Sequence, residues 1–85
     1  MKVLIPSPLR SYTGASEVDA EGDTLDAVLR DIDRRHPGLR FRMVDEQDRV
    51  RPHVRVFVDG EQVFDLGRRM GPGESVQIVQ ALSGG

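Results

Sequence analysis

The sequence contains no cysteine, one lysine and only two histidines. Without cysteine, disulfides, thiolate metal sites and an internal sulfur nucleophile are all excluded. Small secreted domains usually depend on disulfides, and the sequence has neither a signal-like apolar segment at its start nor an apolar run long enough to span a membrane. We therefore expect a cytoplasmic protein with no membrane partner.

Metal binding and nucleic-acid binding are also disfavoured. His36 and His53 do not stand at ligand spacing, so we expect no metal site. Eleven of the twelve basic residues are arginine, but acidic residues are interleaved with them and the net charge is −2. No aromatic ladder accompanies them, so solvated surface is the expectation. A local basic patch is the alternative, formed by Arg34-Arg35, Arg40/Arg42, Arg49/Arg51/Arg55 and Arg68-Arg69.

The chain has 85 residues, of which 38% are hydrophobic and 31% charged, an ordinary globular balance. A chain of this size buries roughly two-thirds of its surface in one small core and has no room for a deep pocket. We expect one domain over residues 1–81 followed by a C-terminal tail over 82–85. A self-contained enzyme is disfavoured.

The clearest predicted element is a helix after Gly22. Asp23 or Thr24 can cap it, and one apolar stripe follows at helical spacing until Pro37-Gly38 ends the pattern. The stripe consists of Leu25, Val28, Leu29 and Ile32.

Strands are predicted on both sides of this helix. Residues 2–6 and 17–20 read as a hairpin with a turn near Gly14, and 54–58 and 61–64 read as a second hairpin across Asp59-Gly60. A last strand begins at Val76 after the Gly71–Glu74 turn. Residues 39–44 fit either a strand or one more helical turn, and 66–70 fit a loop or a single helical turn.

These elements predict an α+β fold, because the apolar stripe of the helix needs a sheet face to cover. A right-handed crossover would place the third strand, 54–58, beside the first, and the last strand can also lie along the first in the centre. This is the β-grasp (ubiquitin-like) arrangement, a mixed curled sheet of four to five strands packed on one main helix.

The sequence ends in Gly84-Gly85, which average glycine usage would give in only about 0.5% of chains. Residues without a Cβ can pass in extended form through a channel too narrow for any other residue. We therefore expect the α-carboxylate of Gly85 to be the functional group.

A docking surface beside this tail is predicted from the alternation of the strands. Val76 and Ile78 should face the helix, which leaves Val79 and, on its own strand, Phe57 on the open face of the sheet. Together with Leu82 they would form an exposed apolar patch that leads to the tail. The alternative is that the 39–44 segment covers Phe57. Charge complementarity to an acidic partner could come from Arg55, Arg68 and Arg69.

The chain resembles the MoaD/ThiS family of ubiquitin-like sulfur carriers over essentially its whole length. The marks of this resemblance are Gly22-Asp23-Thr24-Leu25, Pro37-Gly38-Leu39, Val56-Phe57-Val58-Asp59-Gly60, Pro72-Gly73-Glu74-Ser75-Val76 and Leu82-Ser83-Gly84-Gly85. The start of the chain and of the helix looks closest to the branch that serves cysteine biosynthesis. Gln80 departs from the proline and Asp59 from the asparagine that are common in the family.

The resemblance implies a protein co-substrate rather than an enzyme. A MoeB/ThiF-type adenylyltransferase, using ATP and Mg²⁺ that this chain does not itself bind, would convert the Gly85 carboxylate to an acyl-adenylate. A sulfur donor protein would displace AMP to leave a thiocarboxylate, and a sulfur-accepting biosynthetic enzyme would take the sulfur. The partner-binding residues would be Phe57, Val79, Leu82, Ser83 and Gly84.

Two other functions stay open from the sequence. The first is a ubiquitin-like protein modifier conjugated through Gly85, and the second is a plain β-grasp interaction module whose diglycine is incidental. Among sulfur acceptors, cysteine biosynthesis is the first choice, followed by molybdopterin formation and then by thiamin or a specialised thio-metabolite.

Overall fold

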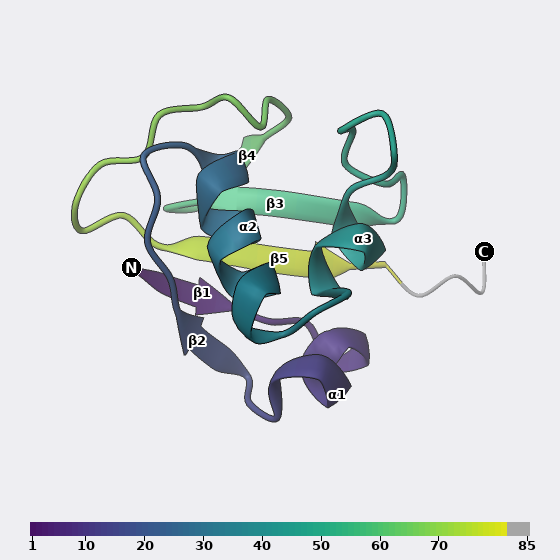
Figure 1. Ribbon diagram of the computed structural model, residues 1–85. Helices are drawn as coiled ribbons and strands as arrows, with labels where there is room; N and C mark the ends of the chain where they lie inside the picture. The colour runs from purple at the N-terminus through teal and green to yellow at the C-terminus, as the bar shows by residue number, and fades with distance from the viewer. Residues whose placement is uncertain (82–85) are drawn as a thin grey trace.

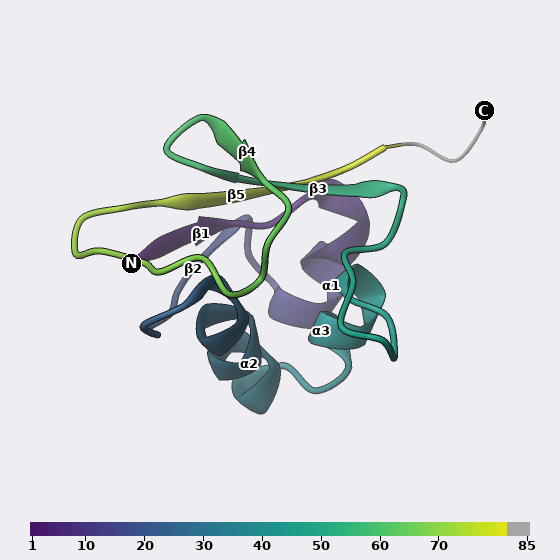
Figure 2. The ribbon, with the colours of Figure 1, turned by 90° about the horizontal axis from the view of Figure 1, so that it is seen from above.

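The structure is a computed structural model that describes residues 1–81. Within these residues, a five-stranded sheet carries the helices on one face, and no helix covers the other face (Figures 1 and 2). The elements in chain order are β1 (Lys2–Leu4), the 3₁₀ turn η1 (Ser7–Leu9), α1 (Arg10–Thr13), β2 (Glu17–Asp19), α2 (Leu25–Arg35), α3 (Leu39–Met43), β3 (Val54–Val58), β4 (Glu61–Val63) and β5 (Val76–Gln80).

The strand order is β2-β1-β5-β3-β4, with β1 and β5 parallel and every other neighbouring pair antiparallel. This mixed sheet with α2 across it confirms the predicted β-grasp fold. The last strand lies in the centre beside β1, as expected. The prediction that the third strand would also lie beside β1 is wrong, because β5 occupies that position. The connection from β1 to β3 passes over the sheet through α2. Because a helix about 10 Å across is as wide as two strand spacings of about 4.8 Å, there is room for one strand, β5, between β1 and β3.

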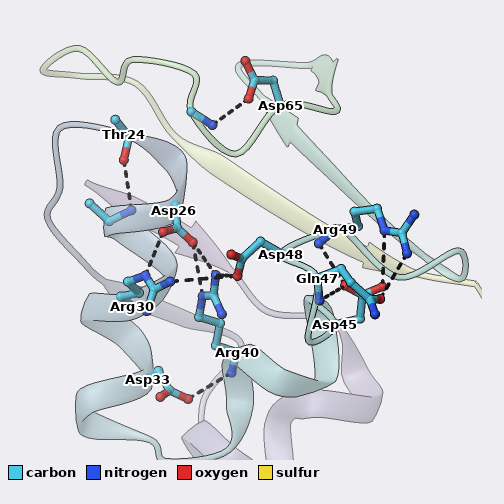
Figure 3. Close-up of polar contacts among 12 residues, drawn as sticks. Thr24, Asp26, Arg30, Asp33, Arg40, Asp45, Gln47, Asp48, Arg49 and Asp65 are labelled. Atoms are coloured by element: carbon cyan, nitrogen blue, oxygen red, sulfur yellow. Dashed lines mark hydrogen bonds and ion pairs between the residues drawn. The ribbon is translucent and has the colours of Figure 1, made fainter.

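The α2 helix forms as its sequence pattern predicts. The Thr24 side chain accepts a hydrogen bond from the Ala27 N–H at 3.1 Å (Figure 3), a cap that contributes about 1 kcal/mol. The four residues of the apolar stripe are all buried, namely Leu25, Val28, Leu29 and Ile32. Gly38, with φ of 96°, then turns the chain into α3.

The segment that the sequence left open, 39–44, is helical. Leu39 and Met43 of α3 are buried in the core, which decides between the strand and the helical turn. Residues 66–70 form turns and a bridge rather than a helix. The turn predicted near Gly14 is preceded by η1 and α1, and Gly14 has the expected positive φ of 69°. Only Leu9 is buried in these two short elements, so the sequence has no apolar stripe from which they could have been predicted.

The β3–β4 hairpin turns at the predicted residues. Asp59 and Gly60 both have positive φ, 49° and 85°, as a two-residue turn of type I′ requires. The Asp59 carboxylate also accepts from the Ser75 N–H at 2.9 Å, which ties this turn to the start of β5.

The core lies between the sheet and the helices, and no polar or charged residue among positions 1–81 is buried in it. Val3, Val56, Val76 and Ile78 are the principal sheet residues in it. Within the part of the chain that the structure describes, no helix has the length and apolarity needed to cross a membrane.

Candidate functional site

The central strand β5 carries the chain toward its C-terminus and is held on both sides. Its pairing with β3 continues beyond Gln80, because the Ala81 N–H donates to the His53 carbonyl at 2.8 Å. Ala81 therefore leaves the sheet at a fixed point, at the end opposite to Val76 (Figure 1). We refer to Val79–Ala81 as the tail root.

The predicted tail residues themselves, Leu82, Ser83, Gly84 and Gly85, lie outside the described residues. Their roles as partner-binding residues and as the reactive terminus stay predictions.

The predicted faces of β5 and β3 are confirmed. Val76 and Ile78 are buried on the helix side, whereas Val79 is 37% exposed on the open face. Phe57 is half-buried on that same open face, between the buried Val56 and Val58. Since α3 packs on the opposite face of the sheet (Figure 2), the alternative in which the 39–44 segment covers Phe57 is wrong.

The open face contains one apolar residue that the sequence analysis missed. Leu4 is 39% exposed and stands in register with Gln77, next to Val79 on the neighbouring strand. In a strand, Val3 and Leu4 must face opposite sides of the sheet, which could have predicted the exposure of Leu4. The alternation is hard to see because Val3, Leu4 and Ile5 are all apolar. We call Leu4, Phe57 and Val79 the open-face patch.

A groove of about 500 Å³ runs beside this patch between β5 and the segment that follows β1. Its lining includes Leu4, Pro6, Pro8, Arg10 and Val79. The groove therefore leads from the apolar patch to the tail root.

Two further aromatic rings are exposed away from the patch. Phe64, just after β4, is 79% exposed, and Phe41 on α3 is 54% exposed. The Arg51 guanidinium lies over the Phe41 ring, 4.6 Å from its centroid. Neither ring borders the groove at the tail root.

The loop before β5 is fixed by an ion pair. Arg68 Nη2 lies 2.9 Å from Glu74 Oε2, and the Gly71 N–H donates to the other carboxylate oxygen at 2.6 Å. The hydrogen bonds from Arg68 and then from Gly71 lower the pKa of Glu74 to about 2. Arg68 is thus engaged inside the chain, at the end of β5 far from the tail root, rather than presented to a partner there.

No group of three or more histidine, aspartate or glutamate side chains converges as metal ligands among residues 1–81. His53 contributes its backbone carbonyl to the tail root, and its imidazole borders a separate hollow of about 390 Å³ with Tyr12, Arg42 and Gln80. Gln80 Oε1 is buried and accepts no hydrogen bond from the described residues.

Comparison with known proteins decides the family. The model of the ThiS family matches residues 3–85. The chain belongs to the ThiS family. The resemblance to MoaD/ThiS sulfur carriers, drawn above from scattered motifs, is thereby confirmed.

A sulfur carrier protein is among the relatives of this chain. The chain is 36% identical over 89 residues to the sulfur carrier protein CysO of Mycobacterium tuberculosis, covering 98% of this chain and 96% of that protein. It also superposes on CysO in the Amycolatopsis orientalis BexX/CysO complex with a TM-score of 0.90 and 32% identity, covering 99% and 98% of the two chains. These relatives are carriers and not catalysts, and this ThiS-family chain is placed with them.

A third neighbour is SAMP1 of Haloferax volcanii, with a TM-score of 0.80 and 26% identity, covering 100% of this chain and 98% of that one. This likeness agrees with the ubiquitin-like fold of the ThiS-family chain.

Proposed function

We propose that this protein carries sulfur on its C-terminus for cysteine biosynthesis in the cytoplasm. A MoeB/ThiF-type adenylyltransferase activates the Gly85 carboxylate, and a sulfur donor protein converts it to a thiocarboxylate. The observation that carries the proposal is the 36% identity to a sulfur carrier protein over 98% of the chain, in a sequence that ends in Ser83-Gly84-Gly85.

The chemistry explains why a partner with ATP and Mg²⁺ is needed. A carboxylate is a poor electrophile, so one of its oxygens first attacks the α-phosphate of ATP, forming the acyl-adenylate and releasing pyrophosphate. Sulfide (HS⁻) supplied by the donor protein then attacks the Gly85 carbonyl carbon; the new C–S bond replaces the C–O bond to AMP, which departs with its electron pair, and the thiol proton is lost to solvent. The resulting thiocarboxylate is a soft nucleophile that delivers its sulfur to the acceptor enzyme. In this scheme the adenylyltransferase, and not this chain, binds the nucleotide and the metal ion.

The open-face patch is the proposed docking surface for these partners. Phe57 and Val79 lie on the uncovered face of the sheet, and Leu4 extends the apolar surface to β1. Apolar patches of this kind mark protein interaction sites. Leu82, Ser83 and Gly84 would continue from the patch into the catalytic channel of the partner. The complex of Amycolatopsis orientalis CysO with BexX supports a role for partner enzymes.

The test is intact mass spectrometry of the protein after coexpression with the adenylyltransferase and a sulfur source. We expect replacement of one C-terminal oxygen by sulfur. An unchanged mass, when the same enzyme thiocarboxylates an accepted carrier in parallel, would refute the proposal.

The acceptor is tested separately with the purified thiocarboxylated protein. It is offered to a cysteine-synthase-type enzyme and to a molybdopterin synthase large subunit. Sulfur transfer to the first and not to the second is expected, and the opposite outcome would assign the chain to molybdopterin formation.

A second candidate is protein modification through Gly85, favoured by the likeness to Haloferax volcanii SAMP1. It uses the same activation but ends in an isopeptide bond to a lysine of the target. Lys2 is the only lysine in the chain, so polymers of this protein could form only there or at the N-terminus. Covalent adducts of the tagged protein on denaturing gels, absent for a variant without Gly84-Gly85, would establish this function.

A further inference from the structure

The arginines of this chain divide into two groups by their partners. Six of the eleven form ion pairs with carboxylates within residues 1–81, and Figure 3 shows three of these, Arg30, Arg40 and Arg49. Five form no ion pair with a carboxylate of the described residues: Arg10, Arg42, Arg51, Arg55 and Arg69. Most of these five lie near one another in the fold.

Four of the five lie around the tail root. Arg55 stands directly across from Val79 in the β3–β5 register. Arg10 lines the groove that Val79 and Gln80 also line, and Arg42 lines the second hollow that Gln80 borders. The Arg51 carbonyl accepts from the N–H of Val54, the first residue of β3. We call Arg10, Arg42, Arg51 and Arg55 the arginine collar.

Three side chains of the collar are held by neutral groups. Arg10 Nε donates to the Ile5 carbonyl at 2.9 Å, Arg42 Nε to the Tyr12 hydroxyl at 2.6 Å, and Arg51 Nε to the Phe41 carbonyl at 2.7 Å. These contacts hold the guanidinium groups without an ion pair, although the Asp45 carboxylate lies near enough to Arg51 to interact with its charge. A planar guanidinium still has donors available for a carboxylate from outside.

The two sides of the collar differ in the carboxylates near them. The groove lined by Arg10 and the hollow lined by Arg42 include no acidic side chain among their described lining residues. Around Arg51 and Arg55, by contrast, Asp48 and Asp65 line the same hollow, although neither forms an ion pair with these two arginines. In a chain of net charge −2, positive charge without a neighbouring carboxylate is therefore concentrated in the groove and the hollow lined by Arg10 and Arg42, beside the tail root.

We propose that the arginine collar docks against an acidic rim around the channel of the enzyme that adenylates the C-terminus. This inference rests on the proposed function and names the chemistry of its partner. Because salt screens charges within about 8 Å at physiological ionic strength, the collar acts only on a surface that comes close to the tail root. Complementary charge of this kind raises association rates and selects partners.

The test measures kcat/KM for adenylation by the chain's own MoeB/ThiF-type enzyme, at low and at high salt. The variant Arg55→Glu and the double variant Arg42→Glu/Arg55→Glu are compared with Arg69→Glu and Arg34→Glu/Arg69→Glu. These controls make the same change in net charge at exposed arginines away from the tail root. Arg69, which the sequence grouped with Arg55, bridges to Thr24 in the loop before β5 and so lies at the far end of that strand. Circular dichroism and thermal melting select variants that keep the wild-type fold.

We expect the collar double variant to lose about tenfold in kcat/KM at low salt, with a smaller loss at high salt, and the controls to stay within about twofold of wild type. Equal losses of kcat/KM in the collar and control variants would overturn the proposed docking role of the arginine collar. No adenylation of the wild type would instead refute the proposed function, which separates the two failures. Salt-sensitive binding of wild type to duplex DNA, lost in Arg55→Glu while adenylation is unchanged, would assign the collar to nucleic acid and overturn the proposal.

Discussion

The Ala81 N–H donates to the His53 carbonyl at 2.8 Å, one residue beyond the last residue of β5. This bond extends the β3–β5 ladder to the end of the described chain. The arginine collar surrounds this point, and the open-face patch extends from Val79 along the sheet to Leu4 and Phe57, which both stand in register with Gln77.

The double variant Leu4→Thr/Val79→Thr should weaken partner docking without unfolding the protein. Both residues are more than a third exposed, and threonine keeps the preference for strands while it makes the surface polar. We expect kcat/KM for adenylation to fall about tenfold, or about 1.4 kcal/mol, while the free energy of unfolding changes by less than about 1 kcal/mol. Phe64→Thr is the control, because Phe64 is exposed away from the patch. An equal loss for both variants would contradict the docking role.

Ile78, the residue before Val79 in β5, should matter for the stability of the fold rather than for partner docking. Ile78 is 2% exposed and packs in the core, so Ile78→Ala should lower the free energy of unfolding by about 2–5 kcal/mol. Urea denaturation of Ile78→Ala and Val79→Ala measures this contrast. Similar costs at the two positions would show that the assigned faces of β5 are wrong.

Glu74 should make stability depend on acid pH. Its pKa falls from the usual 4.5 to about 2, chiefly through the hydrogen bond from Arg68. A carboxylate with a depressed pKa stabilises the fold fully above pH 4.5, and this contribution is lost as the pH falls toward 2. Urea midpoints should therefore be lower for Glu74→Gln than for wild type at pH 7, and the difference should vanish near pH 2. Glu46→Gln, at an exposed residue without an ion pair among positions 1–81, should show no such convergence.

Gly22→Ala should destabilise the protein although the residue is outside the core. A Cβ at Gly22 would lie 2.5 Å from the Val28 nitrogen and 2.7 Å from the Ala27 carbonyl carbon, both in the backbone of α2. Backbone atoms cannot rotate away, so we expect a loss of about 1–3 kcal/mol in the free energy of unfolding. Gly71→Ala is the matched control, since its Cβ would meet only the Glu74 side chain at 3.7 Å. Equal midpoints for the two variants in urea denaturation would refute the close approach.

Gly85→Ala should separate activation from folding. The buried core of residues 1–81 extends from Val3 to Ile78, and if Gly85 acts as a free terminus, as proposed, thermal melting should match wild type. A methyl group on the terminal residue should block entry to a channel that fits only glycine, and mass spectrometry should find no thiocarboxylate. Normal thiocarboxylation of this variant would show that the terminal glycine is not required.

Local pattern was sufficient to predict much of this molecule from its sequence. The α2 stripe and cap, the Asp59-Gly60 turn and the two faces of β5 follow from spacing within a few residues of one another, and the structure confirms each. The ThiS family was recognisable from ordered short motifs. The Gly84-Gly85 terminus is evident in the sequence, and its role remains a proposal.

Only the tertiary structure decided the placement of elements relative to one another. It put β5 between β1 and β3, made residues 39–43 a helix, and exposed Leu4 beside Val79. It also showed that Arg68 is neutralised by Glu74 whereas Arg55 has no ion pair among the described residues. The sequence does not show which of the eleven arginines are neutralised. That depends on which carboxylates the fold brings near each arginine, and some of these carboxylates come from distant parts of the chain.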